Sequence, residues 1–112
     1  MNQRDADPPR PLTPATFHIL LSLAQEPAHG YHIKRMVEER TGGAVRLGAG
    51  TLYAGIRRMT REGLIQEIEA PEDAGDVEPG SRWRFYTITR AGQDALEADL
   101  EAARAAVPRH AG

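Results

Sequence analysis

The chain has 112 residues, enough for one small domain, and a formal net charge of −2 at pH 7. Cysteine is absent, which excludes disulfide bonds and thiolate chemistry and is typical of a cytoplasmic protein. No apolar run reaches the roughly 18 residues of a membrane-spanning helix, and the amino-terminal residues lack the apolar stretch of a signal peptide. A cytoplasmic protein without a membrane partner is expected.

Positive and negative side chains occupy different parts of the chain. Basic residues dominate positions 31–61, whereas every charge from 62 to 80 is acidic. The slightly negative net charge alone argues weakly against a nucleic-acid partner, but this sorting predicts a local basic surface that such a partner needs. The basic residues of the first segment are Lys34, Arg35, Arg40, Arg46, Arg57, Arg58 and Arg61.

The first third of the chain predicts an arm and two helices. Residues 1–11 are polar and rich in proline, which predicts a flexible arm. Thr13 followed by proline is typical of a helix start, and this helix is expected to end near Glu26. A second helix begins at Gly30 and ends at a glycine pair. Gly30 and Tyr31 are interpreted as a tight helix start and a packing anchor, with a phosphate contact as the alternative.

Residues 48–63 predict a third helix with two different sides. At 100° per residue, Leu52, Ile56 and Met59 fall on one side, which therefore faces the core. Gly55 lowers helix propensity and suggests that another backbone crosses the helix closely at this point. The opposite side carries Tyr53, Ala54, Arg57, Arg58 and Arg61.

The rest of the chain predicts a hairpin and a last helix. Residues 64–69 and 82–89 are rich in β-branched and aromatic residues and predict two strands, joined by an acidic tip. Thr89 is expected to cap the last helix, which continues until Pro108. Its apolar stripe needs a neighbour, and we expect a second copy of the chain to provide it. The stripe consists of Leu96, Leu100, Ala103 and Val107.

Three helices followed by a hairpin form the order of a winged helix-turn-helix, whose third helix lies in the major groove of DNA. Arginine on the exposed side of that helix suits both guanine edges and phosphates. Double-stranded DNA is therefore the expected partner. The predicted DNA-contact residues are Lys34, Thr51, Tyr53, Ala54, Arg57, Arg58, Arg61, Arg82 and Arg84.

Five short motifs between residues 12 and 100 carry a resemblance to a known family. They are Leu12-Thr13, His29-Gly30-Tyr31, Gly50-Thr51-Leu52-Tyr53, Glu62-Gly63-Leu64-Ile65 and Tyr86-Thr87-Ile88-Thr89-Arg90-Ala91-Gly92. In these the sequence resembles PadR-type transcriptional regulators, and its short carboxyl end is similar to the small members with a single terminal helix. The resemblance implies a bacterial dimeric DNA-binding regulator, usually a repressor, with dimer contacts through the last helix. It also implies a small aromatic or drug-like effector at the dimer interface.

Two features depart from that family. The family often has Ser-Pro before its Gly-Thr-Leu-Tyr motif and a proline after it, where this chain has Gly48-Ala49 and Ala54. The wing tip, residues 71–80, is unusually acidic and would repel phosphates. We therefore expect the wing contact to come from Arg82 or Arg84, with the tip held away from the duplex.

The expected fold is mainly α with a small β-hairpin: a winged helix-turn-helix plus a carboxyl-terminal dimerisation helix. The predicted divisions are a flexible arm (1–11), the DNA-binding domain (12–90), the dimerisation helix (91–107) and a flexible tail (108–112). Packing of the last helix onto the first within one subunit is the alternative to the dimer. For the arginines of the third helix, the alternative is an ordinary solvated helix face.

No enzyme, cofactor or metal site is expected. His29 and His32 are three residues apart, but there is no cysteine, and the acids considered near them lie at the other end of the helix. His18 is interpreted as a partly buried or interface histidine, since no nucleophile lies beside it. Trp83 is expected to pack the hairpin onto the helices.

The sequence therefore predicts a dimeric repressor that binds a pseudo-palindromic operator and is released by an effector of unknown identity. The alternative is a protein–protein adaptor whose basic face meets an acidic partner. The overall acidity and the acidic wing favour that alternative.

Overall fold

The computed structural model describes residues 12–70 and 84–107. Within these ranges the elements are α1 (Pro14–Gln25), β1 (Ala28–His29), α2 (Gly30–Arg40), α3 (Ala49–Arg61), β2 (Ile65–Ile68), β3 (Phe85–Ile88) and α4 (Arg90–Ala106). This order confirms the predicted winged-helix fold and adds one strand to it. None of the helices described is long and apolar enough to cross a membrane. The predicted arm and tail lie outside the described residues.

Three of the four helices begin at a side chain that accepts a hydrogen bond from the amide three residues further on. Thr13 does so for α1 at 3.2 Å, His29 for α2 at 3.1 Å and Thr89 for α4 at 3.1 Å. The two threonine caps confirm the prediction, whereas the His29 cap was not predicted. Gly48, which begins α3, has no side chain with which to cap it.

The sheet is antiparallel and has the strand order β1-β3-β2. In the hairpin, Ile65 pairs with Ile88 and Ile68 with Phe85. Both strands are shorter than predicted, and the predicted tip lies outside the described residues. The two-residue strand β1 was missed, because it is too short to show a periodicity and exists only through its pairing with β3.

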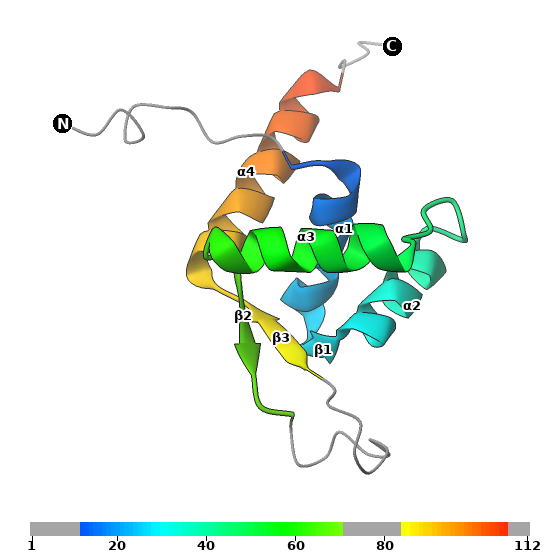
Figure 1. The fold of residues 1–112 in the computed structure, drawn as a ribbon. Helices are drawn as coiled ribbons and strands as arrows, with labels where there is room; N and C mark the ends of the chain where they lie inside the picture. The colour runs from blue at the N-terminus through cyan, green and yellow to red at the C-terminus, as the bar shows by residue number, and fades with distance from the viewer. Residues whose placement is uncertain (1–11, 71–83, 108–112) are drawn as a thin grey trace, which may run out of the picture.

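The core forms where α3 crosses α1, with the sheet at one end and α4 running away from it (Figure 1). Ile19 and Leu20 of α1 are fully buried, and the α3 residues predicted to face the core are at most 2% exposed. The predicted close approach at Gly55 comes from side chains and not from a backbone. A Cβ placed there would lie 3.2 Å from Cδ1 of Ile19 in α1.

Hydrogen bonds hold the start of α4 against the end of α3. Gly63 ends α3 with φ at 77°, as predicted, and its carbonyl accepts a hydrogen bond from the Thr89 hydroxyl at 2.6 Å. The Thr89 amide donates to the Leu64 carbonyl at 3.0 Å. A Cβ at Gly92 would collide with the backbone oxygen of Leu64. Only glycine therefore allows the first turn of α4 to pack this closely.

Candidate nucleic-acid interface

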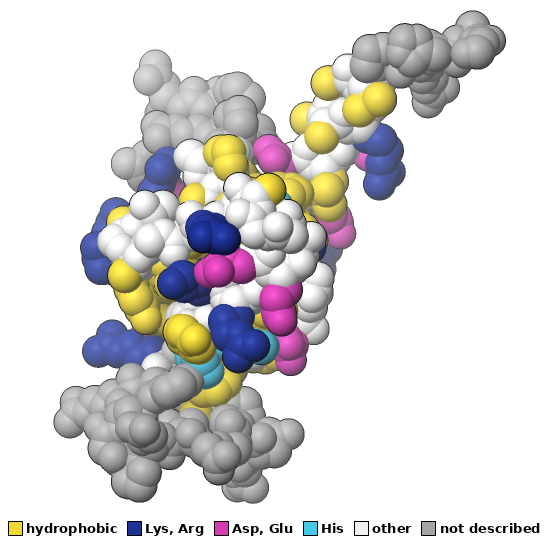
Figure 2. Space-filling model, turned by 90° about the vertical axis from the view of Figure 1, so that its right-hand side faces the viewer, with side chains coloured by type: hydrophobic (Ala, Val, Ile, Leu, Met, Phe, Trp, Pro, Cys, Tyr) yellow, Lys and Arg dark blue, Asp and Glu magenta, His cyan; other side chains and the backbone are white. Residues whose placement is uncertain are grey.

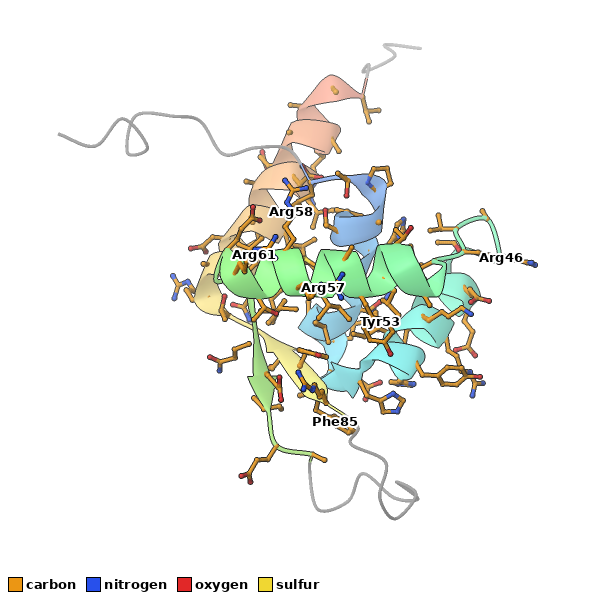
Figure 3. The ribbon with its side chains drawn as sticks, in the orientation of Figure 1. Arg46, Tyr53, Arg57, Arg58, Arg61 and Phe85 are labelled. Atoms are coloured by element: carbon orange, nitrogen blue, oxygen red, sulfur yellow. The ribbon has the colours of Figure 1, made fainter. Side chains whose placement is uncertain are left out.

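The outward side of α3 is basic and uncovered by any described element. Arg57, Arg58 and Arg61 are exposed; Arg57 and Arg61 lie on the side of α3 that faces the viewer in Figure 3, and Arg58 lies at its upper edge. Basic side chains also project along the left-hand edge of Figure 2, where this side of the molecule is seen in profile. Thr51 and Ala54 are exposed on the same helix. The buried and basic sides of α3 are thus opposed, as the sequence predicts.

The three arginines do not have the same electrostatic surroundings. Arg58 forms an ion pair with Glu62, from Nε to Oε2 at 3.4 Å, and both side chains are 46% exposed. Within residues 12–70 and 84–107, Arg57 and Arg61 have no ion-pair partner. Their guanidinium groups therefore keep all their donors available to an outside acceptor.

The tyrosine of α3 is held by the start of α2. A Cβ at Gly30 would lie 2.8 Å from the Tyr53 hydroxyl oxygen and 3.0 Å from Cε1, so the absence of a side chain makes room for the ring. Tyr53 nevertheless remains 44% exposed. Tyr31 is 56% exposed, so its interpretation as a packing anchor is wrong. The glycine of this pair does serve the tight contact, but its partner is Tyr53.

The amino-terminal end of α3 extends the basic surface. Gly48, Ala49 and Gly50 are exposed at the start of the helix, where backbone amides and the helix dipole favour a phosphate. Arg46 precedes this turn and extends beyond the helix end (Figure 3). It was not among the predicted contacts, although its place in the basic segment was a usable signal. Lys34, on α2, is half-buried.

The wing contributes one described cation. Arg84 is exposed and pairs with Glu67 on β2, from Nη1 to Oε1 at 3.6 Å. The pairing of Glu67 with Arg84 was not predicted, because it forms only when β2 and β3 meet. Burial raises the pKa of the neighbouring Tyr86, and Glu67 adds to that effect. Arg82 and Trp83 lie outside the described residues.

The histidines at the start of α2 have structural roles. His29 Nδ1 accepts the cap hydrogen bond, and its ring meets Phe85 edge-on at 5.3 Å between centroids. His32 Nε2 lies 3.3 Å from Oε1 of Glu26, a contact that was not predicted. Burial, and next the charge of His32, lowers the pKa of His29. Among the described residues, no group of three or more His, Asp or Glu side chains is arranged to hold a metal ion.

A polar cluster lies between α1 and α2. Arg40 donates to the Ser22 hydroxyl at 2.7 Å, and that hydroxyl donates to the His18 carbonyl at 2.9 Å. His18 is half-buried, as expected, and its pKa is lowered by burial and by the charge of Arg40. These contacts tie the end of α2 to α1.

The apolar stripe of α4 divides into two parts. Leu96 is 5% exposed and belongs to the core of its own chain, so for this residue the alternative of packing within the subunit applies. Leu100 is 38% and Val107 64% exposed, and Ala103 is exposed as well. In Figure 2 the distal end of α4 projects from the body with hydrophobic side chains on its surface. The predicted interface thus loses Leu96 as a surface residue and keeps the other three.

The family model for the transcriptional regulator PadR-like family matches residues 19–98 of the chain. The match covers all of α2 and α3, the described strands, most of α1 and the anchored part of α4. The interface residues on α3 and the junction at Thr89 therefore lie inside the matched segment.

Two curated relatives match over most of this chain. The first is an uncharacterized 37.1 kDa protein in transposon TN4556 of Streptomyces fradiae, 35% identical over 83 residues, or 74% of this chain. The second is protein X of Lysinibacillus sphaericus, 28% identical over 75 residues, or 67% of this chain. The matched segments span 21% and 64% of those proteins, respectively.

Solved structures of regulators share the fold. A PadR family transcription regulator from Clostridium difficile R20291 is 28% identical with a TM-score of 0.66, and the match covers 80% of this chain and 86% of that one. H. salinarum RosR is 28% identical with a TM-score of 0.68, covering 98% and 84% of the two chains. Another structure of RosR, the hsRosR-SG complex, has a TM-score of 0.70 at 28% identity, covering 94% and 84%.

The family model and the PadR family structure are both of transcriptional regulators. The motifs on which the resemblance was drawn fall largely within the matched residues. This chain belongs to the transcriptional regulator PadR-like family.

Proposed function

We propose that the protein is a homodimeric repressor that binds a pseudo-palindromic DNA operator through α3. The observation that carries this proposal is the uncovered basic side of α3, on which Arg57 and Arg61 have no ion-pair partner among the described residues. With 13 residues the helix is about 20 Å long, and an α-helix fits the width of the major groove. Its family and the solved PadR family structure support the regulatory part of this proposal.

Each group on this surface has a chemistry that fits one part of a duplex. Arg57 and Arg61 can donate two parallel hydrogen bonds to a guanine edge or bind phosphate. Thr51, Tyr53 and the exposed start of α3 suit the phosphate backbone, as does Arg46 beyond that start. Lys34 on α2 and Arg84 before β3 are further cations that suit phosphate, and Ala54 offers a small apolar contact.

The dimer is supported by the distal half of α4. Leu100, Ala103 and Val107 are exposed in the single chain, and a second copy would bury them. A twofold dimer would present two α3 helices about 34 Å apart, one turn of DNA. An effector that changes this separation would release the operator, because a rigid pair of helices fits only one half-site spacing.

The first experiment is a gel shift on the DNA upstream of the chain's own gene, repeated at several salt concentrations, with sedimentation of the free protein to measure its oligomeric state. Arg57→Ala should weaken operator binding by about 1–3 kcal/mol if the side chain contacts a base, whereas loss of a phosphate contact should reduce the salt slope by about one. Arg90→Ala is the matched control, because Arg90 is an exposed arginine outside α3 that is paired with Asp94. Absence of any sequence preference would favour the adaptor instead.

A further inference from the structure

Two of the arginines near the predicted DNA surface are already neutralised by the chain itself. Arg58 is paired with Glu62 at the end of α3, and Arg84 with Glu67 on β2. All four side chains are about half exposed or more, and exposed ion pairs of this kind add little stability. Either pair can therefore exchange its carboxylate for another anion without disturbing the core.

The carboxylates of Glu62 and Glu67 both belong to the segment that follows the carboxyl end of α3. Glu62 directly follows α3, and β2, which carries Glu67, begins three residues later and packs against α3. The carboxyl end of a helix also carries partial negative charge, which adds to the carboxylates. A DNA phosphate that approaches Arg58 or Arg84 therefore shares the guanidinium with a carboxylate and is repelled by it, whereas no carboxylate of the described residues is paired with Arg57 or Arg61.

We propose that Glu62 and Glu67 compete with DNA phosphates for Arg58 and Arg84 and thereby limit sequence-independent DNA binding. This inference rests on the proposed function, since it concerns the same surface. The carboxylates act on DNA through the arginines that they hold, so both are positioning residues. Arg57 and Arg61, which have no paired carboxylate among the described residues, then contribute more of the free energy of DNA binding than Arg58 and Arg84.

The test uses Glu62→Gln and Glu67→Gln in the full chain, with binding to a scrambled duplex measured as a function of salt concentration. Each added phosphate contact should steepen the slope of log K against log salt by about 0.9, which corresponds to about eightfold tighter binding at 0.1 M salt relative to a 1 M reference. The double variant should gain roughly twice the slope change. A gain of affinity cannot arise from misfolding.

Two controls separate local exchange from a general change of charge. Glu101→Gln changes the net charge equally, but its pair with Arg104, at 3.9 Å, lies on the distal half of α4. This variant should keep the wild-type slope. In an Arg58→Gln background, Glu62→Gln should no longer increase the slope, because the arginine that it releases is gone.

The possible outcomes distinguish the inference from the function on which it rests. If the wild type binds DNA and both glutamine variants keep its affinity and slope, the competition is absent. If Glu101→Gln tightens binding as much as they do, the effect is only one of net charge and the inference is also overturned. If the wild type binds no DNA at any salt concentration, the proposed function fails first.

Discussion

The helices α3 and α4 are both amphipathic, but only in α3 are all the apolar residues of the core-facing side buried within the chain. Its apolar residues Leu52, Ile56 and Met59 are all buried, and charge occupies its outward side. In α4 the apolar stripe is buried at Leu96 and becomes exposed one turn later at Leu100. The comparison teaches that α3 leaves a mainly basic surface exposed, with Tyr53 and Ala54 beside its arginines, whereas α4 leaves aliphatic side chains exposed. The first suits a nucleic acid and the second a protein.

The largest expected effect comes from breaking the anchor of α4. Gly92→Ala should lower the free energy of unfolding by about 3 kcal/mol, because a Cβ meets the Leu64 backbone and lies 2.7 Å from Ile88 Cγ1. Chemical denaturation measures the loss. Gly50→Ala is the control, since its Cβ would have no neighbour within 4 Å. Equal stability of the two variants would show that α4 is not packed this tightly.

The next effect concerns the exposed half of α4. Leu100→Lys should weaken the proposed dimer by about 2 kcal/mol, since it places a charge in an apolar contact. Sedimentation equilibrium at several protein concentrations measures the change. Ala102→Lys, on the opposite side of the same helix, should leave association unchanged. An unaltered dimer in both variants would assign the interface to another surface.

A smaller effect is expected where α3 crosses α1. Gly55→Ala gains up to about 1 kcal/mol of helix propensity, while its Cβ approaches Ile19 Cδ1 to 3.2 Å. The Ile19 methyl group is the flexible end of a side chain, so the net change in unfolding free energy should stay within about 1 kcal/mol. A thermal melt beside that of Gly92→Ala makes the contrast direct. If Gly55→Ala lowers the free energy of unfolding as much as Gly92→Ala does, the Ile19 side chain cannot move to make room for the added methyl group.

The smallest effect is a pH dependence at the start of α2. Burial, and next the charge of His32, lowers the pKa of His29 from 6.5 in the folded chain. Below pH 6.5 the unfolded chain therefore binds protons more readily, and stability should fall as the pH decreases through and below that value. His18 acts in the same direction. His29→Asn keeps a cap acceptor and should flatten the dependence measured by denaturation at several pH values. An unchanged profile would assign the dependence to other groups.

The sequence predicted what depends on local patterns. The helical period separated Leu52, Ile56 and Met59 from the arginines, and Thr13 and Thr89 were found as caps because threonine is typical there. The fold class followed from the order of the elements and from the motifs of the family. All of these signals lie within short stretches of chain.

What the sequence missed depends on contacts between distant segments. The strand β1 exists because His29 meets Phe85, and the role of Gly30 depends on the Tyr53 ring. The pairing of Arg84 with Glu67 likewise requires the hairpin to close. The sequence could not separate the buried part of the α4 stripe from its exposed part. Leu96 and Leu100 are both leucines on one side of the helix, and only the extent of the folded core makes the first buried and the second exposed.

The hydrogen bonds of Thr89 connect the start of α4 to the end of α3. Its hydroxyl and amide are fastened to Gly63 and Leu64, the two residues through which the chain leaves α3 for the wing. The helix α4 also packs onto α1 and buries Leu96 in the core, so only its distal half stands clear of the body. A second copy that binds this distal half would therefore act on a helix held at its start by the exit from α3 and along its length by α1.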